Sequence, residues 1–417
     1  MTTLREMTSA APDGAPPGER SGLRPRPVLA VGALSVGAFS FVTAETLPIG
    51  LLPQIGADLH RTLSGSGLLV TAYALIVLVM SVPLTLLTRR IPRRPLLGAL
   101  FVAFTAATLA AAAAPSFGVL VGARLLTALA QALFWSVVVP TATTQVPLRQ
   151  RARAVSAVFT GSALGPVVGM PAGTWLGQQL GWRTAFLALA TLAAATCVAL
   201  VLSLPATRRE AEAVHVGDHP DARGYAVLLV VITLAIAGTF TTYTYVTAHL
   251  VQVAGLPARA LSAVLLLTGG ASIAGAALSV ALVRRSPRAG IQVPLALMVA
   301  AAGSLHLAGR WVIPAVLTFA LMALAGSSFA AALATRVLTT APGDTDIASA
   351  GSSSAYNAGI GAGAWLGAQI VATHGVHATA LGALALTTAA LAVAACHRPR
   401  AAQRSPGHLT GERPQQE

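Results

Sequence analysis

Charge is what this sequence has least of. Only 10% of its residues are charged, whereas soluble globular proteins carry about 25%. Hydrophobic residues make up 55% of the chain, and the mean hydropathy is +0.73. This composition argues against a water-soluble globule, and a disordered chain or a coiled coil would need far more charge.

Cysteine and lysine are also scarce. The two cysteines, Cys197 and Cys396, both lie inside apolar runs, so we expect neither a disulfide framework nor a cysteine metal site. All 27 basic residues are arginines, which is typical of a GC-rich genome. The chain has no Walker A stretch, no residues at metal-ligand spacing and no supported nucleophile–base arrangement. We therefore expect no cofactor, no metal site, no ATP-binding domain and no enzyme.

Long apolar runs are what the sequence does contain. The net charge of +14 does not predict nucleic-acid binding, because the arginines form short clusters between these runs instead of one basic face. A helix that spans the bilayer needs about 20 mostly apolar residues. Twelve runs meet this requirement, at residues 28–51, 65–87, 95–114, 117–139, 154–178, 182–204, 225–249, 261–283, 291–308, 311–334, 347–372 and 377–396. The predicted fold is an all-α membrane protein with twelve transmembrane helices in the lipid bilayer.

The polar segments divide these spans into two halves of six. We expect an N-terminal six-helix bundle over residues 28–204 and a C-terminal six-helix bundle over residues 225–396. A cytoplasmic linker at residues 205–224 joins them and is the only long polar break inside the chain. The tails, residues 1–27 and 397–417, are expected to be disordered and cytoplasmic.

Arginine placement predicts the orientation. With the N-terminus inside, 22 arginines fall in the cytoplasmic tails and loops, whereas only Arg61, Arg183, Arg259 and Arg310 fall outside. Cytoplasmic loops of membrane proteins carry such an excess. We therefore expect a multi-pass protein of the cell (inner or plasma) membrane with both termini in the cytoplasm.

The two halves also repeat each other in sequence. Gly-Thr-Trp-Leu-Gly at residues 173–177 recurs as Gly-Ala-Trp-Leu-Gly at residues 363–367, 190 residues later. The arginine cluster at residues 89–94 recurs at residues 284–288. With six spans in each half, both halves have the same orientation, which predicts a parallel six-plus-six repeat.

Six short segments carry a family resemblance. Residues 43–56 resemble the first-helix signature of the twelve-span drug:proton antiporters of the major facilitator superfamily, and residues 73–75 with 80–83 resemble their second helix. Residues 132–136, 243–246 and 357–364 are similar to bacterial sugar efflux transporters that export arabinose and IPTG. The resemblance covers about residues 30–395. It implies a proton-coupled secondary exporter of a small solute, a sugar or sugar-like compound, that works by alternating access.

Two family motifs are matched unequally. The loop after span two keeps only its arginines, Arg90, Arg93 and Arg94, and departs from the pattern at Thr85, Arg89 and Pro92. A cluster that sets membrane topology explains these arginines as well as an inner gate does. The span-five antiporter motif is closer, and its glycines and prolines are Gly161, Gly165, Pro166, Gly169, Pro171 and Gly173. Glycines let a neighbouring helix approach and prolines bend the span, so the motif fits either an exporter or ordinary small-residue packing.

Glu45 is the only one of 13 acidic residues within a predicted span. A charge at membrane depth is costly, and such a group often relays protons. Arg124 is the only intramembrane arginine, and it lies about 10 Å below the outer boundary, as Glu45 does. The equal depth predicts pairing, or coupling through water. Alternatively, Glu45 is a structural hydrogen-bonding group or lies near the interface, and Arg124 snorkels or fixes helix contacts.

Candidate solute-binding residues are polar or aromatic groups on spans four, seven and eleven. Amides suit sugar hydroxyls, and aromatic rings stack on the apolar face of a sugar. Residues four apart share a helix face, as do Gln131 with Trp135 and Tyr245 with His249. The full set is Gln131, Trp135, Tyr243, Tyr245, His249, Asn357 and Gln369. Each could instead make a helix–helix contact, and His249 could be an interface residue.

Other functions stay open on the same residues. A multidrug or antibiotic efflux antiporter, for example of amphenicols, would use the same mixed polar and aromatic groups. A non-transporting membrane sensor is a weaker alternative, because no long soluble signalling domain is present. The expected partners are a small-molecule substrate, protons and the lipid bilayer, with no nucleic acid, and we expect a monomer.

Overall fold

The computed structural model describes residues 25–88, 90–204, 221–342 and 345–397. Residues 1–24 and 398–417 of the expected tails, residues 205–220 of the expected linker and Arg89 lie outside the described residues. Throughout the described ranges the chain is helical, with short turns and no strand. This agrees with the predicted all-α fold.

Six spans form the N-terminal half. Its segments are α1 (Pro25–Asp58), α2 (Leu63–Thr88), α3 (Arg93–Ala112), α4 (Phe117–Thr144), a short 3-10 turn η1 (Leu148–Gln150), α5 (Arg151–Leu164), a π-helical turn η2 (Gly165–Gly169), α6 (Met170–Leu180) and α7 (Trp182–Ser203). Segments α5, η2 and α6 run on without a break and together form span five.

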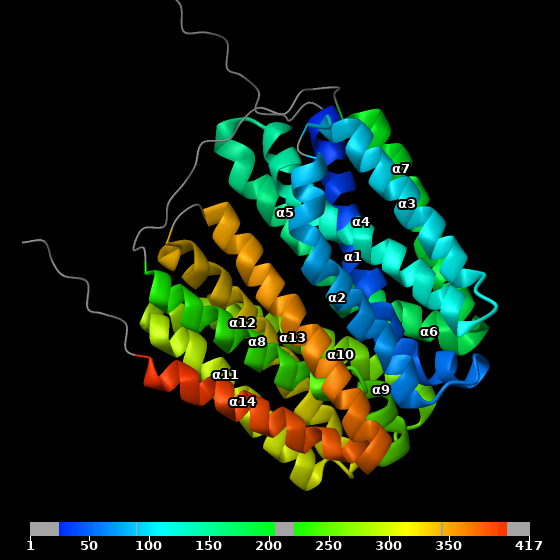
Figure 1. Ribbon diagram of the computed structural model, residues 1–417, viewed down its shortest axis with the longest axis vertical. Helices are drawn as coiled ribbons and strands as arrows, with labels where there is room; N and C mark the ends of the chain where they lie inside the picture. Colours follow the sequence, from blue (N-terminus) through cyan, green and yellow to red (C-terminus); the bar gives the residue numbers. More distant parts are fainter. Residues whose placement is uncertain (1–24, 89, 205–220, 343–344, 398–417) are drawn as a thin grey trace, which may run out of the picture.

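The C-terminal half repeats this order. Its segments are α8 (Ala222–Tyr243), α9 (Val246–Ala248), a π-helical turn η3 (His249–Val253), η4 (Ala258–Ala260), α10 (Leu261–Arg285), α11 (Pro287–Ala308), α12 (Val312–Thr340), α13 (Thr345–His374), η5 (Val376–Ala378) and α14 (Thr379–Cys396). Eleven helical segments in the described ranges are long and apolar enough to cross a membrane. The twelfth span is α13, a 30-residue helix rich in Ser and Gly that packs between α2 and α8 (Figure 1).

Four predicted helix ends differ from the structure by five residues or more. Span four continues past residue 139 to Thr144, and span ten continues past residue 334 to Thr340. Span one continues past residue 51 to Asp58, because Pro53 lies within the helix and does not end it. Span seven stops at Tyr243, and the chain turns at Thr244 and Tyr245 before α9 begins. The predicted continuous helix over residues 225–249 is therefore broken just where three candidate site residues lie.

Glycine contacts reproduce the internal repeat. A Cβ atom on Gly173 would overlap Leu47 of α1, and a Cβ atom on Gly363 would overlap the carbonyl oxygen of Ala237 in α8. Both members of this contact are shifted by 190 residues. Two further contacts repeat with the same shift, Gly161 on Ser35 with Gly351 on Tyr225, and Gly177 on Leu51 with Gly367 on Thr241. Span five therefore packs on span one as span eleven packs on span seven, so the fold consists of two equivalent six-helix bundles.

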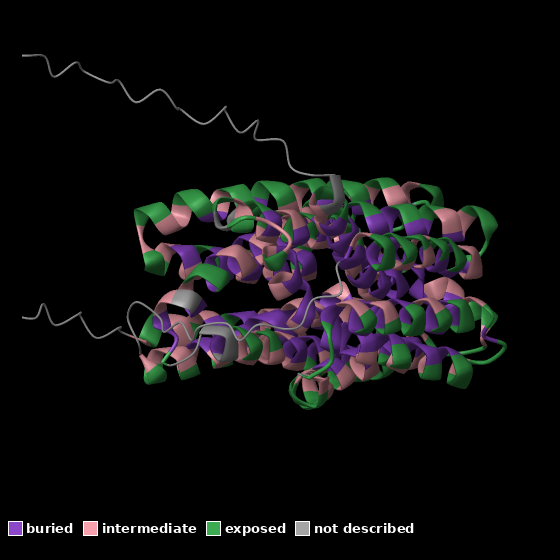
Figure 2. Cartoon of the chain, turned by 90° about the horizontal axis from the view of Figure 1, so that it is seen from above, coloured by how far each residue is buried: buried purple, intermediate pink, exposed green. Residues whose placement is uncertain are grey.

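Each half has its own apolar core. In the N-terminal half, Phe41, Phe101, Phe104 and Phe134 pack together, and the Phe41 and Phe134 rings stack at 4.5 Å. The C-terminal core centres on α8, α11 and α12. Buried residues line the inner sides of the helices, and exposed residues cover the outer sides (Figure 2), as expected for a bundle whose outer surface contacts lipid.

The two ends of the bundle differ in how the halves meet. We call the end that carries Arg90, Arg94 and Arg284 the arginine-rich end, and the end that carries Arg61 and Arg183 the opposite end. At the opposite end, Gln178 Nε2 donates to the Ala258 carbonyl at 2.7 Å, and Tyr245 lies against Gly67. Figure 1 shows the halves converging toward this end, where α6 and α9 lie.

Candidate functional site

Glu45 is joined to two polar side chains of the same half. The Nε2 atom of Gln131 on α4 donates to Glu45 Oε2 at 2.7 Å. The Tyr73 hydroxyl on α2 donates to Gln131 Oε1 at 2.7 Å. Tyr73 and Gln131 are buried, whereas Glu45 is half-buried. The carboxyl group of this half-buried residue is therefore one end of a hydrogen-bonded chain that crosses α1, α4 and α2.

Arg124 lies beside this chain without forming an ion pair with the carboxylate. Its Nη1 donates to the Ala44 carbonyl, and its Nη2 lies 3.4 Å from the Glu45 carbonyl oxygen. Its guanidinium stacks on the Tyr73 ring, 4.3 Å from the ring centroid. Only 2% of Arg124 is exposed. The guanidinium therefore binds the α1 backbone beside Glu45 and packs on Tyr73, and a cation on an aromatic ring is favourable.

Proline explains why α1 offers that carbonyl. Pro48 has no N–H, so the carbonyl of Ala44, four residues earlier, loses its helical partner. Pro53 has the same effect on Ile49, whose carbonyl accepts a hydrogen bond from Thr247 Oγ1 at 3.1 Å. In a membrane, freed backbone groups must find partners in neighbouring helices. Each proline of α1 thus creates a specific acceptor, one used by Arg124 and the other by the C-terminal half.

The predicted equal depth of Glu45 and Arg124 agrees with this contact, although the predicted end of span one, from which the depth of Glu45 was counted, was wrong. Because α1 runs on to Asp58, Glu45 lies about 20 Å from that helix end instead of about 10 Å. Arg124 remains about 10 Å from the start of α4. The two residues meet because α1 extends beyond α4 at the opposite end, where Asp58 forms an ion pair with Arg183.

Two tyrosines of the C-terminal half face the cluster. Tyr356 on α13 lies close enough to Glu45 and Tyr243 to interact electrostatically with both. The Tyr243 hydroxyl lies 3.6 Å from the sulfur of Met170 in span five. Both tyrosines are half-buried. Glu45, Tyr243 and Tyr356 thus bring partly accessible polar groups of both halves to one place between the bundles.

The other predicted binding residues are more scattered. Trp135 stacks on Phe159 of α5 with ring centroids 6.3 Å apart, so it shares a helix with Gln131 but not its contacts. Asn357 Nδ2 donates to the Ser353 carbonyl of its own helix at 3.0 Å, and its buried Oδ1 has no hydrogen-bond partner. Gln369 is exposed and lies one turn beyond exposed Trp365.

Tyr245 and His249 do not share a helix face, because the chain turns before α9. Tyr245 is fully buried against Gly67 of α2 and Gly367 of α13. His249 points into the C-terminal half, where its Nε2 lies 3.0 Å from the Gly309 carbonyl oxygen and its ring lies 5.9 Å from that of His377. Tyr245 thus belongs to the contact between the halves, and His249 to the packing within one half.

The span-five motif packs against α1 along its whole length. Gly161, Gly165, Gly169 and Gly173 each approach α1 closely enough to exclude a Cβ atom. Pro166 lies in the π-helical turn η2, and Pro171 lies in the first turn of α6. These residues set the distance between span five and the helix that carries Glu45.

The three arginines after span two have different surroundings. Arg93 is buried, and its Nη1 donates to the Pro140 carbonyl and to Thr144 Oγ1 of α4. Arg90 is exposed and Arg94 is half-buried. Arg93 thus ties α3 to α4, while the other two remain near the surface at the arginine-rich end.

Sequence reasoning missed Tyr73, Tyr356 and the role of Pro48. Tyr73 and Pro48 lie inside the two helix signatures, and Tyr356 is adjacent to Asn357. A polar ring within an apolar span was the available signal for the tyrosines. In the described part of the chain, no three His, Cys, Asp or Glu side chains are placed to hold a metal ion.

Comparison with solved structures places this fold among membrane transporters. The crystal structure of the human organic anion transporter MFSD10 (TETRAN) superposes with a TM-score of 0.67 at 15% identity, covering 89% of this chain and 100% of that one. A bacterial homologue of the human lysosomal transporter Spinster, inward-facing and unoccupied, gives a TM-score of 0.66 at 15% identity over 90% of this chain and 95% of that one. Its inward-facing, occupied form gives 0.64 at 16% identity, with the same two coverages.

The sequence itself identifies the family. The family profile of the Major Facilitator Superfamily matches residues 34–318, which include Glu45, Tyr73, Arg124 and Gln131. Together with eleven strongly apolar spans, this match identifies a multi-pass membrane transporter. The chain belongs to the Major Facilitator Superfamily.

Proposed function

We propose that the protein is a proton-coupled exporter of a small solute, a sugar or a sugar-like compound, that works by alternating access between its two six-helix bundles. The observation that carries this proposal is the chain from Glu45 through Gln131 to Tyr73, with Arg124 buried beside it. The two bundles, residues 28–204 and 225–396, are the proposed moving units.

The polar chain suits a proton-coupling role. A carboxylate can accept a proton, whereas an arginine does not release one in a protein. Gln131 can keep a hydrogen bond to Glu45 in either protonation state, because its amide both donates and accepts. Solute between the bundles and a proton on Glu45 would therefore compete for one partly accessible group. One proton crossing 100 mV supplies about 2.3 kcal/mol.

The orientation and the state of the molecule are part of the proposal. The arginine excess favours placing the arginine-rich end and both termini in the cytoplasm. The contacts of Gln178 with Ala258 and of Tyr245 with Gly67 would then close the outer side. In this view, export requires those contacts to open while the arginine-rich end closes.

The side chains near Glu45 support a solute that is both polar and flat. The hydroxyls of Tyr243 and Tyr356 could bond to sugar hydroxyls, and their rings could pack against a sugar's apolar face. A second candidate is an aromatic or amphenicol drug, which is favoured by the apolar contact of Tyr243 with Met170 and with the Phe240 ring at 5.7 Å.

A counterflow screen would identify the solute, and retention in cells would give the direction. Purified protein in vesicles should exchange a labelled pentose or galactoside faster than amphenicol or cationic drugs. Cells that express the protein should retain less of that solute, and dissipation of the proton gradient should restore retention. Accumulation of the solute in cells, driven by the proton gradient, would contradict export. Faster exchange of a drug than of any sugar would show that the substrate is a drug.

A further inference from the structure

Two cavities adjoin at the arginine-rich end of the N-terminal half. The first, about 290 Å³, is a groove between α3 and α7. The second, about 410 Å³, lies beyond it at the ends of α4 and α7 and beside the start of α1. Arg94 lines both cavities. Together they form one site with Arg94 between its two parts.

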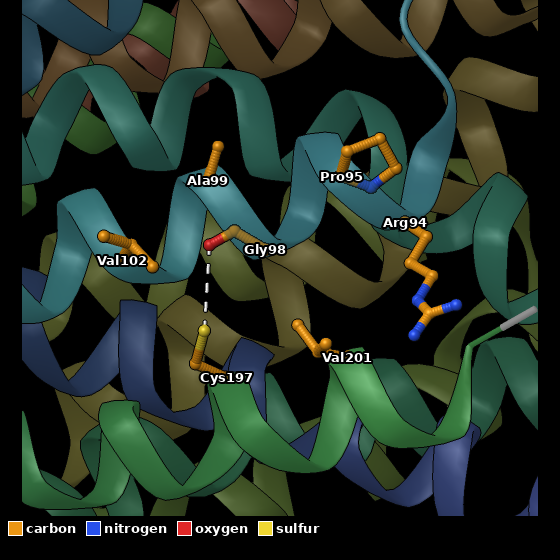
Figure 3. Close-up of a pocket in the computed structure, with 7 residues that line it drawn as sticks. All are labelled: Arg94, Pro95, Gly98, Ala99, Val102, Cys197 and Val201. Atoms are coloured by element: carbon orange, nitrogen blue, oxygen red, sulfur yellow. Dashed lines mark hydrogen bonds between the residues drawn. The ribbon is translucent and has the colours of Figure 1, made fainter. Parts of the chain in front are cut away.

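The groove is apolar and faces outward. Its lining consists of Arg94, Pro95, Gly98, Ala99, Val102, Cys197 and Val201. Val102 is 61% exposed and Val201 is 37% exposed, on two helices that are both long and apolar enough to cross the membrane. In a membrane, such a surface is covered by lipid. The groove runs along α3 and α7, in the direction that an acyl chain takes in a bilayer (Figure 3).

The second cavity is more polar. It is lined by Thr144, Gln145 and Ser203 together with Pro27, Leu202 and Leu204. Hydroxyl and amide groups at the membrane surface suit the hydroxyl groups of a lipid headgroup, which lie beyond the phosphate. The site thus changes from apolar to polar along its length, in the same order as a phospholipid.

Arg94 is available to bind an anion. It makes no hydrogen bond or ion pair with another described side chain, unlike its neighbour Arg93, which binds the end of α4. Figure 3 shows the Arg94 side chain extending from the start of α3 toward the end of α7. A guanidinium in this position can form paired hydrogen bonds with a phosphate.

The equivalent helix pair of the other half, α11 and α14, is joined by a side-chain hydrogen bond. There, Gln292 of α11 reaches across to α14, and its Nε2 donates to the Ala394 carbonyl at 3.3 Å. In the N-terminal half, the Cys197 thiol of α7 lies 3.7 Å from the Gly98 carbonyl oxygen of α3. A Cβ atom on Gly98 would make ordinary contact with Val201 at 3.4 Å, so the missing side chain leaves the groove open.

We propose that this site binds one anionic phospholipid from the leaflet at the arginine-rich end, with an acyl chain in the α3–α7 groove and the phosphate at Arg94. The apolar groove selects a membrane lipid over a free phosphate. The Arg94 guanidinium, which has no side-chain partner among the described residues, selects an anionic headgroup, such as that of phosphatidylglycerol, over a zwitterionic one. The site lies apart from the Glu45 cluster and does not depend on which solute is transported.

Lipid retention on the purified protein tests the proposal. The full chain is equilibrated in detergent with an equimolar mixture of palmitoyl-oleoyl phosphatidylglycerol and phosphatidylcholine, and bound lipid is counted by mass spectrometry. We expect one phosphatidylglycerol per chain in preference to phosphatidylcholine. Arg94→Gln should lower this preference about five-fold, since a basic residue near the headgroups contributes that much to anionic-lipid binding.

Matched variants separate a specific site from general charge. Arg288→Gln removes an exposed arginine at the corresponding end of α11 and should leave the preference unchanged. Gly98→Leu should fill the groove and reduce retention, whereas Gly122→Leu, at a glycine with open space around it, should not. The Gly98 comparison decides the matter if Arg94→Gln does not fold, as judged by size-exclusion chromatography. Equal effects of Arg94→Gln and Arg288→Gln, equal retention in the two leucine variants, or displacement of lipid by glycerol phosphate would overturn the proposal.

Discussion

Gln131 donates a 2.7 Å hydrogen bond to the Glu45 carboxylate and accepts another of equal length from Tyr73. A residue that we expected to bind solute is therefore the direct partner of the expected proton carrier. The arginine expected to pair with Glu45 instead holds the α1 backbone at Ala44. The side chain that directly contacts the Glu45 carboxyl group is thus the Gln131 amide. The buried positive charge of Arg124 makes no hydrogen bond with that carboxyl group.

The first prediction follows from this amide. Gln131→Leu keeps a side chain of similar length but removes both hydrogen bonds, leaving the buried Tyr73 hydroxyl and the Glu45 carboxyl without partners. An unsatisfied buried polar group costs about 1–3 kcal/mol. We expect pH-driven export in vesicles to fall at least ten-fold, while Gln252→Leu, at an exposed position of η3, should behave as wild type. Equal rates in the two variants would show that Gln131 has no part in coupling.

Pro48 is predicted to hold Arg124 in place without touching it. In Pro48→Ala, the new N–H can bond to the Ala44 carbonyl and compete with Arg124 for this acceptor. Hydrogen bonds to charged groups contribute about 1.5–3 kcal/mol, so we expect a lower thermal midpoint and slower pH-driven transport. Pro83→Ala, at an exposed position of α2, is the control and should raise or preserve stability. A stabilised and fully active Pro48→Ala protein would contradict this role.

The close packing of span five on α1 can be tested at Gly161. A Cβ atom there would overlap the backbone carbonyl of Ser35, which no side-chain rotation can relieve. We expect Gly161→Ala to cost about 1–3 kcal/mol and to lower the thermal midpoint in detergent. Gly122→Ala has open space and should be neutral or slightly stabilising. Identical thermal midpoints of Gly161→Ala and Gly122→Ala would mean that span five can move away from α1 without loss of stability.

Contact between the bundles at the opposite end is predicted to break during transport. Gln178 and Ala258 belong to different halves and are joined by a 2.7 Å hydrogen bond. In a background in which Cys197 and Cys396 are replaced by serine, cysteines at positions 178 and 258 can be joined by a short, reducible thiol cross-linker. Transport should stop on cross-linking and return on reduction, with no effect on Gln178→Cys alone. Undiminished transport by the cross-linked protein would refute opening at this end.

Much of the fold can be predicted because membrane helices follow hydropathy closely. Within the described residues, each of the twelve apolar runs coincides with a helical segment. The repeat of residues 173–177 at 363–367 predicts the helix pairing found at Gly173 and Gly363. The errors lie where composition is ambiguous. Pro53 can end a helix or lie within one, and the residues around Tyr245 are as apolar as a continuous helix.

The site was only partly predictable. Glu45 and Arg124 stand out because ionisable groups are rare in apolar spans, and their depths follow from counting residues. The identity of the side chain between them does not follow from such counting, because it depends on how α2 and α4 are rotated against α1. Periodicity within α4 places Gln131 and Trp135 on one face, yet α1 contacts the first and α5 the second. His249 could not be assigned, because the turn after Tyr243 alters the direction of every later side chain in span seven.

The central claim is that the proton moves through Glu45. Its most direct test is uphill transport of the identified solute by reconstituted protein across a fixed pH gradient, measured in Glu45→Gln. Glutamine keeps the shape and the hydrogen bonding but cannot titrate, so we expect uphill transport to fall to background while counterflow, which needs no gradient, continues. Asp58→Asn, which alters the other acidic residue of the described part of α1, should remain coupled. Uphill transport at the wild-type rate in Glu45→Gln would contradict the account and leave Glu45 with a structural role.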